Sequence, residues 1–297
     1  MNRKGLIDMY PDMREHADKI IEKRTKESEV LYHFQKFNAP DVKSILPLSF
    51  SQLTDFAFRR EVWALRRIFG YNFKSNAASE RGKAVESGLN MWLNGIDKQD
   101  AIDKMIDEYH ANCKLFSGQN YDQDTQIKEE EANLIPLFEK GVSSFREFGF
   151  KWNLLDYQKK VELDILGIPI IGYTDFHFED KQTKEDFYID LKTTKRKPSS
   201  LSMAHAMQQS IYHKGTNSNQ RLWYLVAKKT GSEFFDYRVQ DYETPFKICE
   251  QIVCAMINYL KSVDTLEDVK NTLIPNPDDW HWRDKDVLDA RKEVWGY

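Results

Sequence analysis

Apolar residues recur every three to four positions along much of the first half of the chain, and this spacing predicts helices. Ser49-Phe-Ser-Gln52 resembles a capping box, which would open an amphipathic helix carrying Leu53, Phe56 and Leu65. The charge-rich segment 12–36 predicts either a helix or a loosely ordered arm. Further helices are expected over 78–93, 96–115 and 125–148, with Gly149 as a stop signal.

The pattern changes after residue 149, where β-branched and aromatic residues replace the helical spacing. Three segments predict an antiparallel meander: 157–165, 168–178 and 186–192. Beyond them we expect a helix over 201–213, strands over 221–228 and 233–239, and a helix over 244–263. This order predicts an α/β (α+β) protein with one mixed central sheet flanked by helices and a helical N-terminal portion. We expect an N-terminal helical arm (1–47) and one domain (48–297) with a helical insertion at about 96–148.

Composition narrows the class of protein. With 41% hydrophobic and 30% charged residues, the chain has the composition of an ordinary globular protein. No apolar run approaches the roughly 20 residues of a membrane span, and the N-terminus lacks the apolar stretch of a signal peptide. Three cysteines argue against a disulfide framework and exclude a four-cysteine metal site. We therefore predict a cytoplasmic location without membrane contact; for a phage-encoded protein this is the host cytoplasm.

The segment from Gly172 to Lys192 carries the candidate chemistry. Asp175 closes one predicted strand, while Asp190 and Lys192 lie two apart on the next and so leave the same face. In an antiparallel pair, the two carboxylates could reach one Mg²⁺ or Mn²⁺ ion, with the backbone carbonyl of Leu191 and waters completing its oxygen ligands. Lys192 would orient a metal-activated water and offset phosphate charge. Asp-x-Lys also occurs elsewhere in the chain, and the alternative is an exposed ion pair at a strand end.

Other polar residues extend this candidate site. Gln208 and Tyr212 are four apart and share a helix face, from which they could contact the water or a phosphate. Glu86, on an earlier helix, could be a further metal ligand, or simply an exposed acid. The net charge of −4 argues against a surface that binds nucleic acid generally, but basic clusters leave room for a local groove. The candidate nucleic-acid contacts are Arg81, Lys83, Thr193, Lys195 and Arg196, each of which has the alternative of being merely solvated.

Taken together and in order, these motifs resemble the PD-(D/E)XK nuclease superfamily, in its RecB-like and phage exonuclease branch. The similar segments are Leu48-Ser-Phe-Ser51-Gln-Leu53, Gly82-Lys-Ala-Val-Glu86, Gly172-Tyr-Thr-Asp175, Asp190-Leu-Lys192-Thr193 and Gln208 to Tyr212. The resemblance implies a restriction-endonuclease-like fold in which Glu86, Asp175 and Asp190 ligate Mg²⁺ or Mn²⁺. Lys192 would be catalytic, and Gln208 and Tyr212 would support the site.

The chain departs from this family's pattern in two respects. Many RecB-like members carry histidine where this chain has Glu86, which leaves the number of metal ions open. Some members hold a four-cysteine iron–sulfur cluster, but here the corresponding positions lack cysteine, so we expect no cluster.

The resemblance implies a metal-dependent DNA nuclease that hydrolyses phosphodiester bonds in DNA recombination or repair, and an exonuclease rather than a sequence-specific endonuclease. DNA would be its partner, together with a strand-annealing or single-strand-binding protein as a further candidate. Two alternatives stay open: a structure-specific endonuclease of the same fold, and a catalytically silent DNA-binding subunit. The complete Asp175, Asp190 and Lys192 set argues against the silent subunit.

Overall fold

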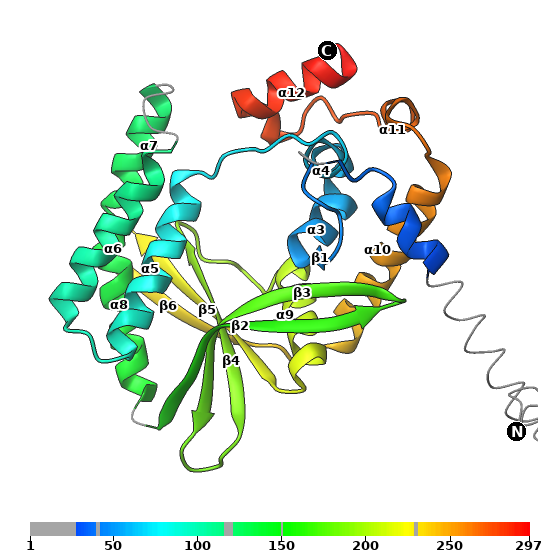
Figure 1. Ribbon diagram of the computed structural model, residues 1–297. Coiled ribbons are helices and arrows are strands. Elements are labelled where there is room, and N and C mark those ends of the chain that lie inside the picture. Colours follow the sequence, from blue (N-terminus) through cyan, green and yellow to red (C-terminus); the bar gives the residue numbers. More distant parts are fainter. Residues whose placement is uncertain (1–27, 40–41, 116–120, 150, 229–230) are drawn as a thin grey trace, which may run out of the picture. The chain divides into compact units, whose positions relative to one another are not determined.

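The computed structural model describes residues 28–39, 42–115, 121–149, 151–228 and 231–297. The described chain forms two compact units (Figure 1). Unit 1 contains the described residues up to Tyr71, with Asp164–Ile170 and Glu250–Tyr297, and unit 2 contains Asn72–Leu163 and Ile171–Cys249. Part of the predicted arm (1–47) lies outside the described residues, and the division at residue 47 stays a prediction.

Unit 1 is mainly helical. A helix over 28–35 precedes the two-residue strand β1 (Leu48–Ser49), α3 (Phe50–Phe58) and α4 (Arg60–Arg67). The Ser49 hydroxyl accepts the amide hydrogen of Gln52, which confirms the predicted helix start. The single helix expected here is wrong, because Arg59 leaves helical geometry (φ −152°, ψ 58°) and separates α3 from α4.

The C-terminal part of unit 1 has helices that the residue pattern did not predict. After α10 (Glu243–Ser262), whose first turns belong to unit 2, the chain forms α11 (Leu266–Thr272), a 3₁₀ turn (Trp280–Arg283) and α12 (Lys285–Trp295). Thr265 and Asp268 form a capping box that starts α11. Buried Trp282 packs within this region, and its indole N–H donates to the carbonyl of Asn276 at 2.5 Å.

Unit 2 is built on a mixed sheet formed by β2 (Trp152–Ile165), β3 (Ile168–Asp180), β4 (Asp186–Thr194), β5 (Asn219–Lys228) and β6 (Gly231–Arg238). The β2–β3 hairpin tip, Asp164–Ile170, is grouped with unit 1. In this sheet β3, β4, β5 and β6 are neighbours in that order, and β2 pairs with β3 outside this path. Strand β4 runs antiparallel to β3 but parallel to β5. A parallel neighbour requires a crossover, which α9 (Met203–Thr216) supplies. The predicted meander and the two later strands are confirmed, with each strand a few residues longer or shifted at its ends.

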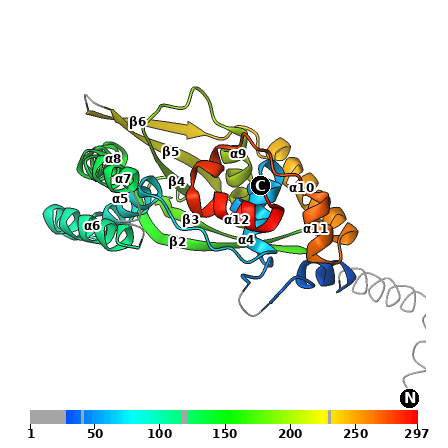
Figure 2. The ribbon, with the colours of Figure 1, turned by 90° about the horizontal axis from the view of Figure 1, so that it is seen from above.

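Four helices cover one face of this sheet: α5 (Ala77–Leu93), α6 (Lys98–Cys113), α7 (Tyr121–Glu131) and α8 (Leu134–Gly149), which lie together in both views (Figure 1 and Figure 2). Alternation along β5 sends Trp223 and Leu225 into the core beneath these helices, and Leu222 and Tyr224 to the α9 face. The single helix predicted over 125–148 is wrong, because it breaks after Glu131 and restarts at Leu134.

A mixed central sheet flanked by helices is the restriction-endonuclease-like architecture, as predicted. Among the described residues, no helix combines the length and apolar character needed to cross a membrane.

Candidate active site

Asp175 and Asp190 lie where β3 and β4 stop pairing. The antiparallel register ends at Phe176 opposite Ile189, so the two aspartates occupy the next position on each strand. There a side chain takes the place of a backbone acceptor from β3: Asp175 Oδ2 accepts the amide hydrogen of Leu191 at 2.6 Å. Both aspartates are buried, with exposures of 8% and 2%. The end of the ladder therefore places both aspartates at neighbouring positions of β3 and β4, on the face of the sheet that carries Leu222 and Tyr224.

Lys192 completes the arrangement predicted for the strand end. Its ammonium Nζ lies 2.6 Å from Asp190 Oδ2, while its side chain stays 28% exposed. Within the described structure, the Lys192 ammonium is the polar group that contacts Asp190 Oδ2, and Asp190 Oδ1 has no hydrogen-bond partner. Buried carboxylate oxygens without hydrogen-bond donors are costly, and they have free lone pairs for another ligand.

The charges of this cluster perturb one another. Burial, followed by repulsion from Asp190 and Glu86, raises the pKa of Asp175 well above its ordinary value. Burial works to lower the pKa of Lys192, but attraction to Asp190 and Asp175 outweighs it and raises that pKa. The structure therefore brings the three predicted acids and the lysine within electrostatic reach of one another.

Glu86 approaches the cluster from α5. It is half-buried, and its Oε1 accepts a hydrogen bond from the side-chain amide of Gln158 on β2. Burial raises the pKa of Glu86, and repulsion from Asp190 raises it further. The hydrogen bonds from Gln158 and Tyr157 lower this pKa but do not outweigh the burial. Gln158 adopts a left-handed backbone (φ 54°), which is uncommon outside glycine. Nothing in the sequence pattern singled out Gln158.

Gln208 and Tyr212 share one face of α9, as their spacing predicts. The Gln208 side-chain amide donates to the Tyr212 hydroxyl at 3.0 Å, and Tyr212 is buried. Burial and the negative charge of Asp190 raise the pKa of this phenol, which stays protonated. Gly172 allows the close approach, because a Cβ there would lie 2.6 Å from Tyr212 Cε1.

The side chain of Arg81 is buried in unit 2 rather than exposed on the surface. It is 3% exposed, pairs with the buried carboxylate of Glu130 on α7, and donates to the Thr193 carbonyl at 3.1 Å. The same guanidinium reaches the Thr193 hydroxyl at 3.2 Å. Arg81 and Thr193, both predicted to contact nucleic acid, are thus bonded to each other inside unit 2.

The other predicted phosphate contacts are exposed. Lys83 forms an ion pair with Glu80 at 2.7 Å, and Lys195 pairs with Glu130 at 2.8 Å. Arg196 follows directly at the exposed end of β4. Their roles in nucleic-acid binding stay predictions.

His205 and Tyr224 flank Lys192, and sequence reasoning missed both. Tyr224 stands opposite Lys192 in the β4–β5 register, and its hydroxyl is hydrogen-bonded to His205 Nδ1. Burial, and then the charge of Lys192, lowers the pKa of His205. The sequence spacing could have identified His205, because it lies three residues before Gln208 and so on the same helix face.

A divalent cation fits part of this arrangement. Mg²⁺ needs only one or two carboxylates with waters. Asp175 and Asp190 supply buried carboxylate oxygens, and Asp190 Oδ1 has no hydrogen-bond partner in the described structure. Among the described residues, no group of three or more His, Cys, Asp or Glu side chains is arranged to hold a metal ion. Glu86 as a third ligand and the Leu191 carbonyl as a fourth stay predictions.

Comparison with known proteins adds little to this geometry. No protein-family model matches the chain, and no curated protein matches it. A solved structure of a proposed exonuclease from Eubacterium rectale is 12% identical, with 80% of this chain and 92% of that chain covered and a TM-score of 0.49. The solved protein SSO0001 is 14% identical, with coverages of 58% and 84% and a TM-score of 0.30. Both TM-scores lie below 0.5, so neither likeness carries an argument.

Proposed function

We propose that this protein is a metal-dependent nuclease that hydrolyses phosphodiester bonds of DNA. The observation that carries the proposal is the pair of buried carboxylates, Asp175 and Asp190, at the point where β3 and β4 separate, with the Lys192 ammonium 2.6 Å from Asp190. Two acids and a lysine converging at a strand end form a set that can hold a divalent cation and act on a phosphate.

Each side chain has a distinct task in this proposal. A bound Mg²⁺ or Mn²⁺ would lower the pKa of a water and neutralise phosphate charge. Lys192 would hold the scissile phosphate by charge and orient the attacking water. The Gln208–Tyr212 pair would keep that water or a phosphate oxygen in place from the α9 side, and Glu86 would adjust the local charge.

Exposed cations near the site would bind the DNA backbone. Lys83 lies on α5, and Lys195 and Arg196 follow the catalytic strand. We assign Arg81 a positioning role instead, because its guanidinium is buried against Glu130 and Thr193. Phosphate contacts of this kind give affinity without sequence preference.

The energetics favour an enzyme over a silent binding subunit. Burial and repulsion disfavour the charged form of Asp175, so the carboxylate cluster costs stability in the metal-free protein. A protein that only bound DNA would gain stability by losing one of these acids, whereas a catalytic site needs both.

We infer exonuclease action from the family resemblance alone; the alternative is a structure-specific endonuclease of the same fold. Linear double-stranded, linear single-stranded and closed circular DNA, each incubated with Mg²⁺ or Mn²⁺ and with EDTA, distinguish the two. An exonuclease degrades both or one of the linear forms and leaves the circle closed.

Single substitutions locate the activity. Asp190→Asn and Lys192→Met should each reduce the cleavage rate by about a thousandfold or more, because each removes a group that acts on the reacting phosphate. Lys270→Ala, in the unrelated Asp268-Val-Lys270 triplet, is the matched control and should leave the rate unchanged. Full activity of both site variants, or no cleavage of any substrate by the native protein, would reject the proposal.

A further inference from the structure

The backbone of β2 is irregular at Gln158. Four non-glycine residues of the described chain have a left-handed φ: Gln158, Leu166, Lys184 and Asn217. Leu166 and Lys184 lie in the connections before and after β3, and Asn217 ends α9. Among these four, Gln158 alone lies inside a strand, where the conformation is costly for a residue with a side chain. Its side chain is exposed, so burial of Gln158 does not compensate for this cost.

The irregularity at Gln158 separates its two neighbours in the strand. Tyr157 packs on Phe176, with 5.5 Å between the ring centroids, on the sheet face that the four helices cover. Lys159 instead donates to the Tyr188 hydroxyl at 3.0 Å. Tyr188 alternates with core residues of β4 and so lies on the opposite face. Residues 157 and 159 of a regular strand would share one face, so the alternation of β2 is broken here.

Because of this break, two adjacent side chains of β2 reach one carboxylate on α5. The Gln158 side-chain amide donates to Glu86 Oε1, and the Tyr157 hydroxyl donates to the same carboxylate. Adjacent residues of a regular strand point to opposite faces, so a regular β2 could not supply both hydrogen bonds. Glu86 is therefore held by a pair of donors that depends on the irregular backbone.

The same carboxylate lies within electrostatic reach of the proposed metal site. Asp190 and Asp175 repel it, and Lys192 attracts it. Glu86 is only half-buried, and a glutamate side chain has several rotatable bonds. Without its two donors, it would be free to turn away from the aspartates toward solvent. The hydrogen bonds from β2 oppose that movement.

We propose that Gln158, together with Tyr157, is a positioning residue of the metal site, which holds the Glu86 carboxylate toward Asp175 and Asp190. This inference rests on the proposed function. Carboxylates of metal sites are commonly held by hydrogen bonds from residues that do not touch the metal, and loss of such a partner weakens metal affinity. The placement of Glu86 accounts for a backbone conformation that the packing of Gln158 does not explain.

Binding of Mn²⁺ to the full chain without DNA tests this role apart from cleavage. The electron paramagnetic resonance signal of free Mn²⁺ gives the affinity, and binding that is lost on combining Asp175→Asn with Asp190→Asn defines the site. Gln158→Gly tolerates the left-handed backbone and removes the amide, so we expect it to weaken Mn²⁺ binding by about tenfold. Tyr157→Phe keeps the ring and removes the hydroxyl, and should weaken binding by about threefold or more. This second variant guards against misfolding of the glycine variant.

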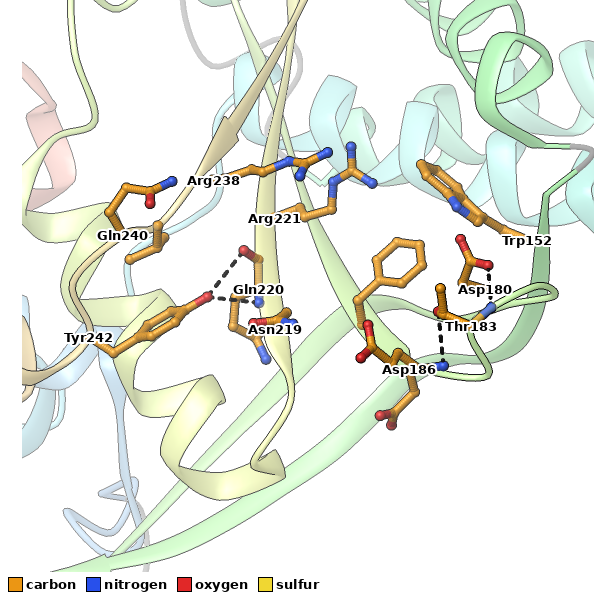
Figure 3. Close-up of a pocket in the computed structure, with 13 residues that line it drawn as sticks. Trp152, Asp180, Thr183, Asp186, Asn219, Gln220, Arg221, Arg238, Gln240 and Tyr242 are labelled. Carbon is orange, nitrogen blue, oxygen red and sulfur yellow. Dashed lines mark hydrogen bonds between the residues drawn. The ribbon is translucent and has the colours of Figure 1, made fainter.

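Two further variants control for the change to glycine. Lys184→Gly alters another left-handed residue outside the site. Gln240→Gly removes an exposed glutamine that lines a separate cavity of about 400 Å³, where Arg221 of β5 and Arg238 of β6 are direct partners (Figure 3). Both variants should leave the Mn²⁺ affinity unchanged.

A double-variant cycle shows whether Gln158 acts through Glu86. Glu86→Ala keeps both aspartates, and we expect it to bind Mn²⁺ about tenfold more weakly than the native protein. In this background Gln158→Gly should change the affinity by less than about twofold. An unchanged affinity in Gln158→Gly or in Glu86→Ala, or an equal loss from Gln158→Gly with and without Glu86, would overturn the positioning role.

Failure of the proposed function gives a different result. If the native protein and the double aspartate variant bind Mn²⁺ equally, the metal site is absent, and the positioning role is rejected with it. If binding depends on the aspartates but not on Gln158, only the positioning role is rejected.

Discussion

At the scale of single residues, Asp175 does two things at once. Its carboxylate accepts the Leu191 amide hydrogen, which satisfies a backbone group that the separating strands leave behind. The same carboxylate is buried beside Asp190 and Glu86, which disfavour its charge. The hydrogen bond explains why the side chain stays fixed, and the repulsion explains why it is available for a cation.

The raised pKa of Asp175 makes stability depend on pH. Because the folded protein holds this proton more tightly than the unfolded chain, the site contributes stability at low pH that is lost as pH rises above the ordinary value of 3.8. Asp175→Asn cannot ionise but can still accept from Leu191. We expect its stability relative to the native protein to be greater at pH 8 than at pH 5, measured by urea unfolding in EDTA. If the difference in free energy of unfolding between the variant and the native protein is the same at both pH values, ionisation of Asp175 does not destabilise the fold.

Gly172 tests the packing that holds Tyr212. A Cβ at this position would meet the tyrosine ring at 2.6 Å, so Gly172→Ala should destabilise the protein by about 2 kcal/mol. The cost should shrink in a Tyr212→Ala background, because the obstructing ring is gone. Thermal or urea unfolding of the two single variants and the double variant measures this coupling. If the losses of the two single variants add up in the double variant, the Tyr212 ring moves aside without cost and does not obstruct a Cβ at position 172.

At the same scale, sequence reasoning succeeded where spacing along one element decides which side chains meet. Asp190 and Lys192 on one strand, and Gln208 and Tyr212 on one helix, are brought together as predicted. It did not foresee that Arg81 is buried. Its partner Glu130 is 49 positions away, so no local pattern records the pair.

At the scale of elements, Arg81 ties three of them together. It lies on α5, its ion-pair partner Glu130 lies on α7, and its hydrogen-bond partner Thr193 is the last residue but one of β4, three residues after Asp190. The C-terminal end of β4 is therefore held against the helices by one buried guanidinium.

Loss of the buried Arg81–Glu130 ion pair should destabilise the fold. Arg81→Met leaves Glu130 buried with only Lys195 as a counterion, so we expect a loss of about 3 kcal/mol in the free energy of unfolding. An Arg81→Met and Glu130→Met double variant should recover most of it, because no buried charge remains unpaired. Lys98→Ala, which breaks an ion pair with Glu139 in which neither side chain is buried, is the control, with an expected change below about 1 kcal/mol. Equal losses in Arg81→Met and the control would contradict the buried tie.

Element types followed from periodicity more securely than element boundaries. The strands of the meander and the crossover helix α9 were predicted from alternation and capping residues. The break at Arg59 was not predicted, because no glycine or proline marks it. The break after Glu131 was missed although Pro136, in the first turn of α8, marks it. The pairing of Arg221 with Arg238 was also beyond prediction, since it depends on the exact register of β5 with β6.

At the scale of the whole molecule, a bound cation should stabilise the fold. Metal that binds only the native state adds about 2.7 kcal/mol when its concentration is a hundred times its Kd. We therefore expect Mg²⁺ or Mn²⁺ to raise the melting temperature of the native protein, and to leave a variant carrying both Asp175→Asn and Asp190→Asn unchanged. The double variant at the same ion concentration separates binding at the two carboxylates from general ionic screening. An equal rise in the double variant would place the metal elsewhere.

The hydrogen bond from Leu191 to Asp175 also gives the molecule an internal reporter. An amide proton that points at a carboxylate changes its nuclear resonance frequency when that carboxylate gains a proton or a cation. One backbone signal, followed by NMR spectroscopy, would thus register occupancy of the site in the absence of any DNA. Protonation and cation binding at Asp175 could in this way be titrated without a nucleic-acid substrate.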